Sequence, residues 1–76
     1  MKIVTIASYR QRGIITGNTI KFATPAGIDY AMKVNPGMYG FEIVECRGRT
    51  VYWLVCGEDY AAMLAHGHRP FRPAAK

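Results

Sequence analysis

Two runs of β-branched and aromatic residues are the clearest feature of the hydrophobic pattern. Residues 41–46 and 50–56 form these runs, and the polar triplet 47–49 separates them. Such runs around a short loop that contains glycine predict a β-hairpin. If Arg47 pairs with Thr50, one face carries Phe41, Ile43, Tyr52 and Leu54, and the other carries Val44, Val51, Trp53 and Val55. Because both faces are then apolar, we expect the hairpin to lie in the middle of a sheet or to be covered on both sides.

Residues 2–8 are predicted to form a strand inside the sheet. Their side chains alternate with the period of a strand, and several of them are β-branched. The polar residues 9–13 end this strand, and residues 14–22 resume β-like character. A first hairpin that turns near Gly13 is the simplest arrangement of these segments.

Residues 23–35 fit two patterns. Thr24 followed by Pro25 is the cap and first-turn pair that begins many helices, and the Asn-Pro-Gly sequence at 35–37 is a helix stop. Gly27 weakens a helix by about 1 kcal/mol relative to alanine. The apolar residues Ile28, Ala31 and Met32 have the spacing of a helix face. The apolar residues Ile28, Tyr30, Met32 and Val34 alternate as on one face of a strand. We predict a helix here, with a strand over 24–34 as the alternative.

A second helix is predicted after the 41–56 hairpin. The acidic residues within 57–59 suit its first turn, and His66 with Gly67 supplies a cation and a stop at its end. Its apolar stripe is Tyr60, Met63 and Leu64. The basic, proline-containing residues 68–76 cannot continue the helix, so they are predicted to be an extended or flexible tail with Phe71 as its only apolar anchor.

These elements predict an α+β fold. The expected order is ββαββα, an antiparallel sheet with two short helices and a basic C-terminal tail. With 76 residues, 50% of them hydrophobic and 20% charged, the chain is expected to form one domain over 1–76 with a thin core.

Composition also bears on the compartment. No apolar run reaches the roughly 18 residues that a membrane helix needs, and the start of the sequence is a poor secretory signal. Cys46 and Cys56 could form at most one disulfide, so free thiols are expected. The sequence predicts a cytoplasmic protein that does not enter a membrane.

The positive charge is concentrated at the two ends of the sequence. Ten Lys and Arg against five Asp and Glu give a formal net charge of +5. Residues 1–21 and 66–76 carry no acid, whereas the middle of the sequence is mildly acidic. If the ends meet in the fold, they form a basic surface that attracts phosphates or an acidic protein surface.

The sequence shows no clear catalytic, metal-binding or cofactor-binding motif. A zinc set of Cys46, Cys56, His66 and His68 lacks the short ligand loops of structural zinc sites, and no phosphate-binding glycine pattern occurs. Cys56 as a thiolate nucleophile has no supporting motif. A ribonuclease built from Tyr9, Arg10, Arg12, His66 and His68 has suitable residue types but an untested arrangement. We therefore expect a binding protein without metal or cofactor rather than an enzyme.

Two binding functions follow from the charge and the aromatic residues. The first is a module that engages nucleic acid or a nucleoprotein complex with low specificity. Its predicted contacts are Tyr9, Arg10, Arg12, Lys21, Arg69, Phe71, Arg72 and Lys76. The alternative is a small inhibitor or modulator protein of the mobile-element or phage type, which uses Arg47 and Arg49 against an acidic protein surface. A homodimer formed by strand addition is possible with either function.

Overall fold

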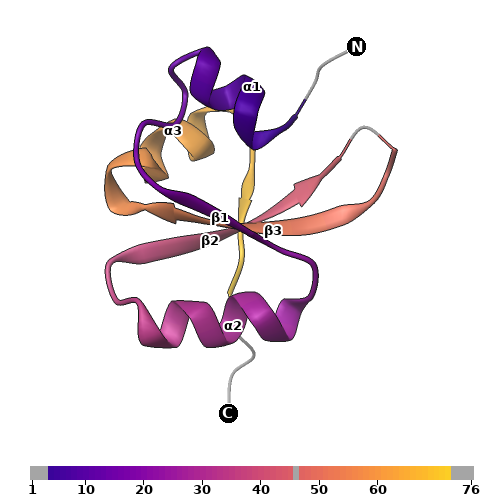
Figure 1. The fold of residues 1–76 in the computed structure, drawn as a ribbon, viewed down its shortest axis with the longest axis vertical. Helices are drawn as coiled ribbons and strands as arrows, with labels where there is room; N and C mark the ends of the chain where they lie inside the picture. The colour runs from indigo at the N-terminus through magenta and orange to yellow at the C-terminus, as the bar shows by residue number, and fades with distance from the viewer. Residues whose placement is uncertain (1–3, 46, 73–76) are drawn as a thin grey trace.

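A four-stranded antiparallel sheet separates two layers of helix in the computed structural model, which describes residues 4–45 and 47–72 (Figure 1). The strand order is β1-β3-β2-β4. The elements are α1 (Ile6–Gln11), β1 (Thr19–Phe22), α2 (Pro25–Val34), β2 (Met38–Val44), β3 (Thr50–Cys56), the 3-10 turn η1 (Gly57–Asp59), α3 (Tyr60–Ala65) and β4 (Arg69–Pro70). The α1 and α3 helices cover one face and α2 covers the other, so the predicted α+β class is confirmed.

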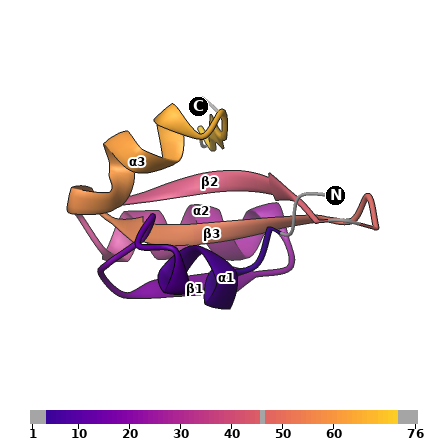
Figure 2. The ribbon, with the colours of Figure 1, turned by 90° about the horizontal axis from the view of Figure 1, so that it is seen from above.

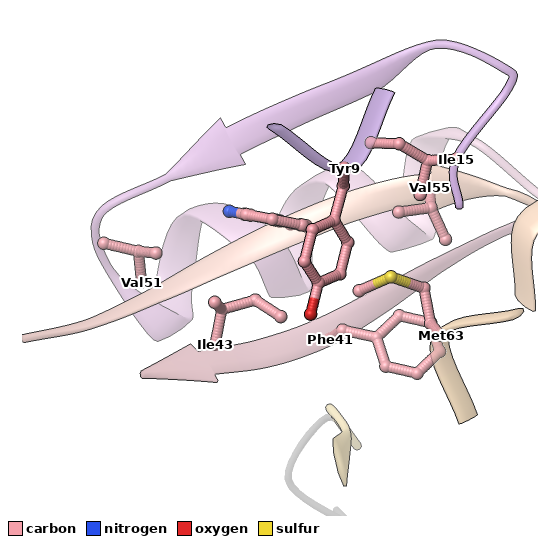
Figure 3. Close-up of a cluster of buried hydrophobic side chains, with 8 residues drawn as sticks. Tyr9, Ile15, Phe41, Ile43, Val51, Val55 and Met63 are labelled. Carbon is pink, nitrogen blue, oxygen red and sulfur yellow. The ribbon is translucent and has the colours of Figure 1, made fainter. Parts of the chain in front are cut away.

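Hydrophobic side chains pack on both faces of the sheet. The cluster under α1 and α3 consists of Tyr9, Ile15, Phe41, Ile43, Val51, Trp53, Val55 and Met63 (Figure 3). The cluster under α2 consists of Ile28, Ala31, Tyr52 and Leu54. Residues 51–55 of β3 are all buried, because this strand lies between β1 and β2 and its side chains alternate between the two clusters.

The first element is a helix, so the predicted strand over 2–8 is wrong in its described part. Thr5 caps α1: its Oγ1 accepts a hydrogen bond from the Ser8 amide at 3.0 Å, and Ser8 Oγ accepts one from the Thr5 amide at 3.3 Å. Tyr9 is buried in an edge-to-face contact with Trp53, with ring centroids 5.5 Å apart, and this contact holds the helix on the sheet. The described chain therefore has three α-helices, and its order differs from ββαββα.

The helix predicted within 23–35 is confirmed. Thr24 Oγ1 accepts a hydrogen bond from the Gly27 amide at 3.2 Å, and Pro25 is the first helical residue. The helix lies close to β2 at Gly40, where a Cβ atom would come within 2.8 Å of both Ile28 and Met32. Glycine at position 40 therefore allows α2 to pack closely against its face of the sheet.

The hairpin is confirmed, but the predicted register is wrong. Thr50 lies opposite Val44 instead of Arg47. Because the shift is odd, it moves each β2 side chain to the other face, and Phe41 shares the α1/α3 face with Trp53. Gly48, with a φ of 81°, permits the tight turn in which its amide donates to the Glu45 carbonyl at 2.8 Å.

The predicted second helix is confirmed as η1 and α3, with Met63 buried but Leu64 exposed. Asp59 was expected to interact with the first turn of this helix, but it binds another segment of the chain. Its carboxylate is buried and accepts hydrogen bonds from the amides of Thr16 and Gly17, each at 2.9 Å. These bonds fasten the loop after α1 to the start of α3.

Part of the predicted tail is ordered as β4. Arg69 pairs with Glu42 and Pro70 with Phe41, while the Phe71 amide donates to the Gly40 carbonyl at 2.8 Å. Proline is tolerated here because β4 is an edge strand. Phe71 packs against the α2-side cluster. In the described ranges, no helix is long and apolar enough to cross a membrane.

Candidate nucleic-acid interface

The chain from His66 to Arg72, here called the edge segment, runs along the outer side of β2. Figures 1 and 2 show it leaving α3, passing the sheet edge and reaching the layer of α2. Gly67, with a φ of 82°, makes the turn out of α3. Beyond this turn, His68 contacts Tyr9 on the α1/α3 side and Phe71 contacts Tyr52 on the α2 side. The segment is therefore held on both faces of the sheet.

Near this turn, Tyr9 contacts three other polar side chains, those of Arg12, His66 and His68. The Tyr9 hydroxyl lies 2.7 Å from His68 Nε2, and the Tyr9 ring lies 5.8 Å from the His66 ring. The Arg12 guanidinium carbon lies 5.8 Å from the centre of the Tyr9 ring. We call Tyr9, Arg12, His66 and His68 the Tyr9 cluster. It brings Arg12, which follows α1, close to the start of the edge segment.

Tyr9 is the buried centre of this cluster. Its side chain is 1% exposed, and burial raises the pKa of its hydroxyl above the ordinary value of 10.0, against a smaller lowering by Arg12. The phenol is therefore neutral at neutral pH and serves as a hydrogen-bond partner for His68. No ring face is left on which a base could stack, so the predicted stacking role does not suit Tyr9.

Three adjoining hollows follow the edge segment. The first, of about 370 Å³, is lined by Glu42, Val44, Gly67, His68 and Arg69. The second, of about 500 Å³, is lined by Glu42, Arg69, Pro70, Phe71 and Arg72. The third, of about 330 Å³, is lined by Met32, Tyr39, Gly40, Tyr60, Pro70, Phe71 and Arg72. Neighbouring hollows share lining residues, and we call the three together the edge groove.

The predicted contacts divide between this groove and other parts of the molecule. Arg69, Phe71 and Arg72 line the groove, and Arg12 belongs to the Tyr9 cluster. Lys21 lies on β1 at the opposite edge of the sheet, where it forms a 3.0 Å ion pair with Glu45. The remaining two are Arg10, whose guanidinium donates to the Gly17 carbonyl at 2.9 Å, and Lys76, which is outside the described residues.

The predicted protein contacts lie at the hairpin tip, which projects beyond the helices at the end of β2 and β3 (Figure 2). Arg47 and Arg49 are both exposed. They line a hollow of about 230 Å³ together with Val4, Thr5 and Glu45. The tip therefore combines two cations with an acid and with a small apolar wall from the start of the chain.

Sequence reasoning missed Tyr39 and Tyr60 as candidate binding residues. Tyr39 is 42% exposed at the start of β2, and its ring lies 4.5 Å from that of Tyr60 at the start of α3. Aromatic residues at strand spacing are usually core, so the spacing of Tyr39 gives no signal for a binding role. The spacing of residues along the sequence cannot predict a contact between a strand residue and a residue of a later helix. The contact of Tyr39 with Tyr60 arises because α3 packs over β2 in the fold.

The described residues contain no group of three or more His, Cys, Asp or Glu side chains that could hold a metal ion. Cys56 has a free thiol that lies 3.5 Å from the Asn18 carbonyl oxygen. The other cysteine of the considered zinc set, Cys46, is outside the described residues.

Comparison with protein-family models, curated proteins and solved structures finds no match to this chain. A function must therefore be inferred from the side chains and surfaces described above.

Proposed function

We propose that this chain is a nucleic-acid-binding module that holds a single strand along the edge groove. The observation that carries the proposal is the placement of Arg69 and Arg72 with aromatic residues in the adjoining hollows of the edge groove. Proteins that bind single strands combine positive charge along a groove with aromatic rings on which bases stack. The edge groove has both features.

The charge around the groove favours a phosphate ligand. The chain has a net charge of +5, and Arg69 and Arg72 line the groove against one acid, Glu42. Arg12 extends the cationic surface on the side of α1. Each arginine that neutralises a phosphate releases counterions, which makes such binding favourable at low salt and weaker as salt rises.

The outer face of α2 is less suited to phosphates. Lys33 on this helix forms a 3.5 Å ion pair with Asp29, which partly neutralises its charge. The other prominent groups there are the exposed side chains of Tyr30 and Val34. A mostly neutral helix of this kind gives no electrostatic reason to enter a DNA groove, so the edge groove is the preferred interface.

The proposal is tested by fluorescence anisotropy of labelled single-stranded DNA and RNA from low to physiological salt. Arg69→Ala with Arg72→Ala is compared with the matched pair Arg47→Ala with Arg49→Ala. We expect the first pair to weaken binding about tenfold and to lower the salt slope by about 1.4, the loss of two phosphate contacts on a single strand. The second pair should change affinity less than about twofold. Equal losses from both pairs, or no binding at low salt, would overturn the proposal.

A small inhibitor or modulator protein is the second candidate function. Its support is the hollow at the hairpin tip, where Arg47 and Arg49 are exposed beside Val4 and Thr5. Exposed arginines around an apolar centre are typical anchors for a protein partner. This function predicts that the tip variants, and not the edge variants, lose capture of a protein from cell extract.

A further inference from the structure

The third hollow of the edge groove, here called the aromatic pocket, has a composition of its own. Three elements supply its rings: Tyr39 from β2, Tyr60 from α3 and Phe71 from the edge segment. Arg72 lines the same pocket, and none of the described residues that line it is acidic. Glu42 lines both other hollows, so this is the part of the groove in which a guanidinium and aromatic rings occur without a carboxylate.

The rings are held in place by the core. Tyr60 packs on the fully buried Phe41, with centroids 5.6 Å apart, and Tyr39 packs on Tyr60 at 4.5 Å. Phe71 is fixed by its edge-to-face contact with Tyr52 at 5.4 Å. A pocket whose walls are fixed before binding loses little conformational entropy when a planar ligand enters.

We infer that the aromatic pocket binds one nucleobase of the strand, stacked on the exposed ring of Tyr39, while Arg72 contacts the adjoining phosphate. This inference rests on the proposed function. Charge complementarity favours a nucleotide as the occupant, because Arg72 lines the pocket and can pair with the phosphate attached to a base held there. The volume of about 330 Å³ is at the lower end of small-ligand pockets, which suits a single nucleotide.

Stacking on an aromatic ring is tolerant of base identity, because every base has a π face. The pocket should therefore distinguish strands that carry bases from strands that lack them, with little preference among bases. Tyr39 is the decisive ring because 42% of its surface is exposed, whereas Phe71 is engaged with Tyr52.

The test uses two labelled probes of equal length, an oligothymidine and an abasic oligonucleotide with the same phosphates. Wild-type protein should bind the oligothymidine about tenfold more tightly. Tyr39→Leu keeps an apolar side chain but removes the ring, so it should reduce that preference to less than about twofold and leave abasic binding unchanged. Tyr30→Leu is the matched control, since Tyr30 is 68% exposed on α2 and lies outside the aromatic pocket.

The outcomes separate the two proposals. If wild-type protein binds both probes equally, or if Tyr39→Leu weakens both equally, the pocket inference is wrong while nucleic-acid binding stands. If neither probe binds at low salt, the proposed function itself is wrong. Photocrosslinking of wild-type protein to a strand containing a halogenated uracil adds a test without substitution. A crosslink at Tyr39, Tyr60 or Phe71 supports the inference, and crosslinks confined to Tyr30 or the hairpin tip overturn it.

Discussion

The edge segment and the hairpin tip present the same charges in different surroundings. Each brings two arginines beside one glutamate: Arg69 and Arg72 next to Glu42 at the edge, and Arg47 and Arg49 next to Glu45 at the tip. A count of charges along the sequence cannot separate these two surfaces.

The residues around the two pairs of arginines differ. The edge segment is fixed on both sides of the sheet, through His68 on Tyr9 and Phe71 on Tyr52, and its arginines adjoin aromatic rings. At the tip, Glu45 is already paired with Lys21, and the hollow is lined by no aromatic residue. Under the proposed function, an arginine contributes to nucleic-acid binding where the fold places a ring and a rigid backbone next to it.

Removal of Phe71 should have the largest effect on stability. Phe71→Ala deletes the anchor that packs against the α2-side cluster, and we expect a loss of about 2 kcal/mol, below the range for a fully buried phenylalanine. Val44→Ala is the matched control toward the tip, because Val44 is 58% exposed and should cost less than about 0.5 kcal/mol. Urea unfolding measures both values. Equal costs would show that Phe71 does not anchor the edge segment.

A pair of glycine substitutions compares the two regions directly. Gly48 and Gly67 have φ values of 81° and 82°, and a Cβ atom would meet nothing within 4 Å at either position. Alanine should therefore cost about 1 kcal/mol at each, from backbone strain alone. We expect oligonucleotide affinity to fall only for Gly67→Ala, because Gly67 sets the path of the edge segment. A fall for Gly48→Ala instead would place the interface at the tip.

Tyr9→Phe removes the hydroxyl that joins α1 to the edge segment. Loss of the hydrogen bond to His68 should cost about 1 kcal/mol at neutral pH. Because burial raises the pKa of Tyr9, its contribution to stability is fully present below pH 10.0 and is lost as pH rises through the higher pKa of the folded state. The stability difference between wild type and variant should therefore narrow above pH 10.0. A constant difference in urea unfolding over that range would contradict the assigned environment of Tyr9.

The smallest predicted effect concerns the two glutamates. Glu42→Gln removes the acid that lines the edge groove and should strengthen oligonucleotide binding about twofold, since a nearby like charge no longer repels phosphate. Glu45→Gln breaks the ion pair with Lys21 and should leave affinity within the error of anisotropy. Stronger binding by the Glu45 variant alone would favour the tip.

The sequence predicted the fold class, the hairpin and α2, because these depend on local signals: β-rich runs for the hairpin and the Thr24-Pro25 start for the helix. It misassigned the first element. The β-branched residues before Tyr9 favour a strand, but the Thr5 and Ser8 cap and the burial of Tyr9 on Trp53 select a helix. Tertiary packing of this kind outweighs intrinsic propensity and cannot be seen in a local window.

The proposed site could also be anticipated only in part. Arg69, Phe71 and Arg72 were among the contacts expected from the sequence, and all three line the edge groove. Tyr39 and Tyr60 were not, because their contact depends on how α3 packs over β2. The hairpin register could not be predicted either, since it depends on the number of residues in the turn, and an odd error exchanges the two faces.

The most direct test of the account follows the backbone amides of isotope-labelled protein by NMR during titration with a single-stranded oligonucleotide. The account predicts that the largest shifts occur in the edge segment and at Tyr39, with little change at Arg47, Arg49 and the outer face of α2. Shifts concentrated at the hairpin tip, or no shifts at low salt, would contradict the claim that the edge groove is the nucleic-acid interface.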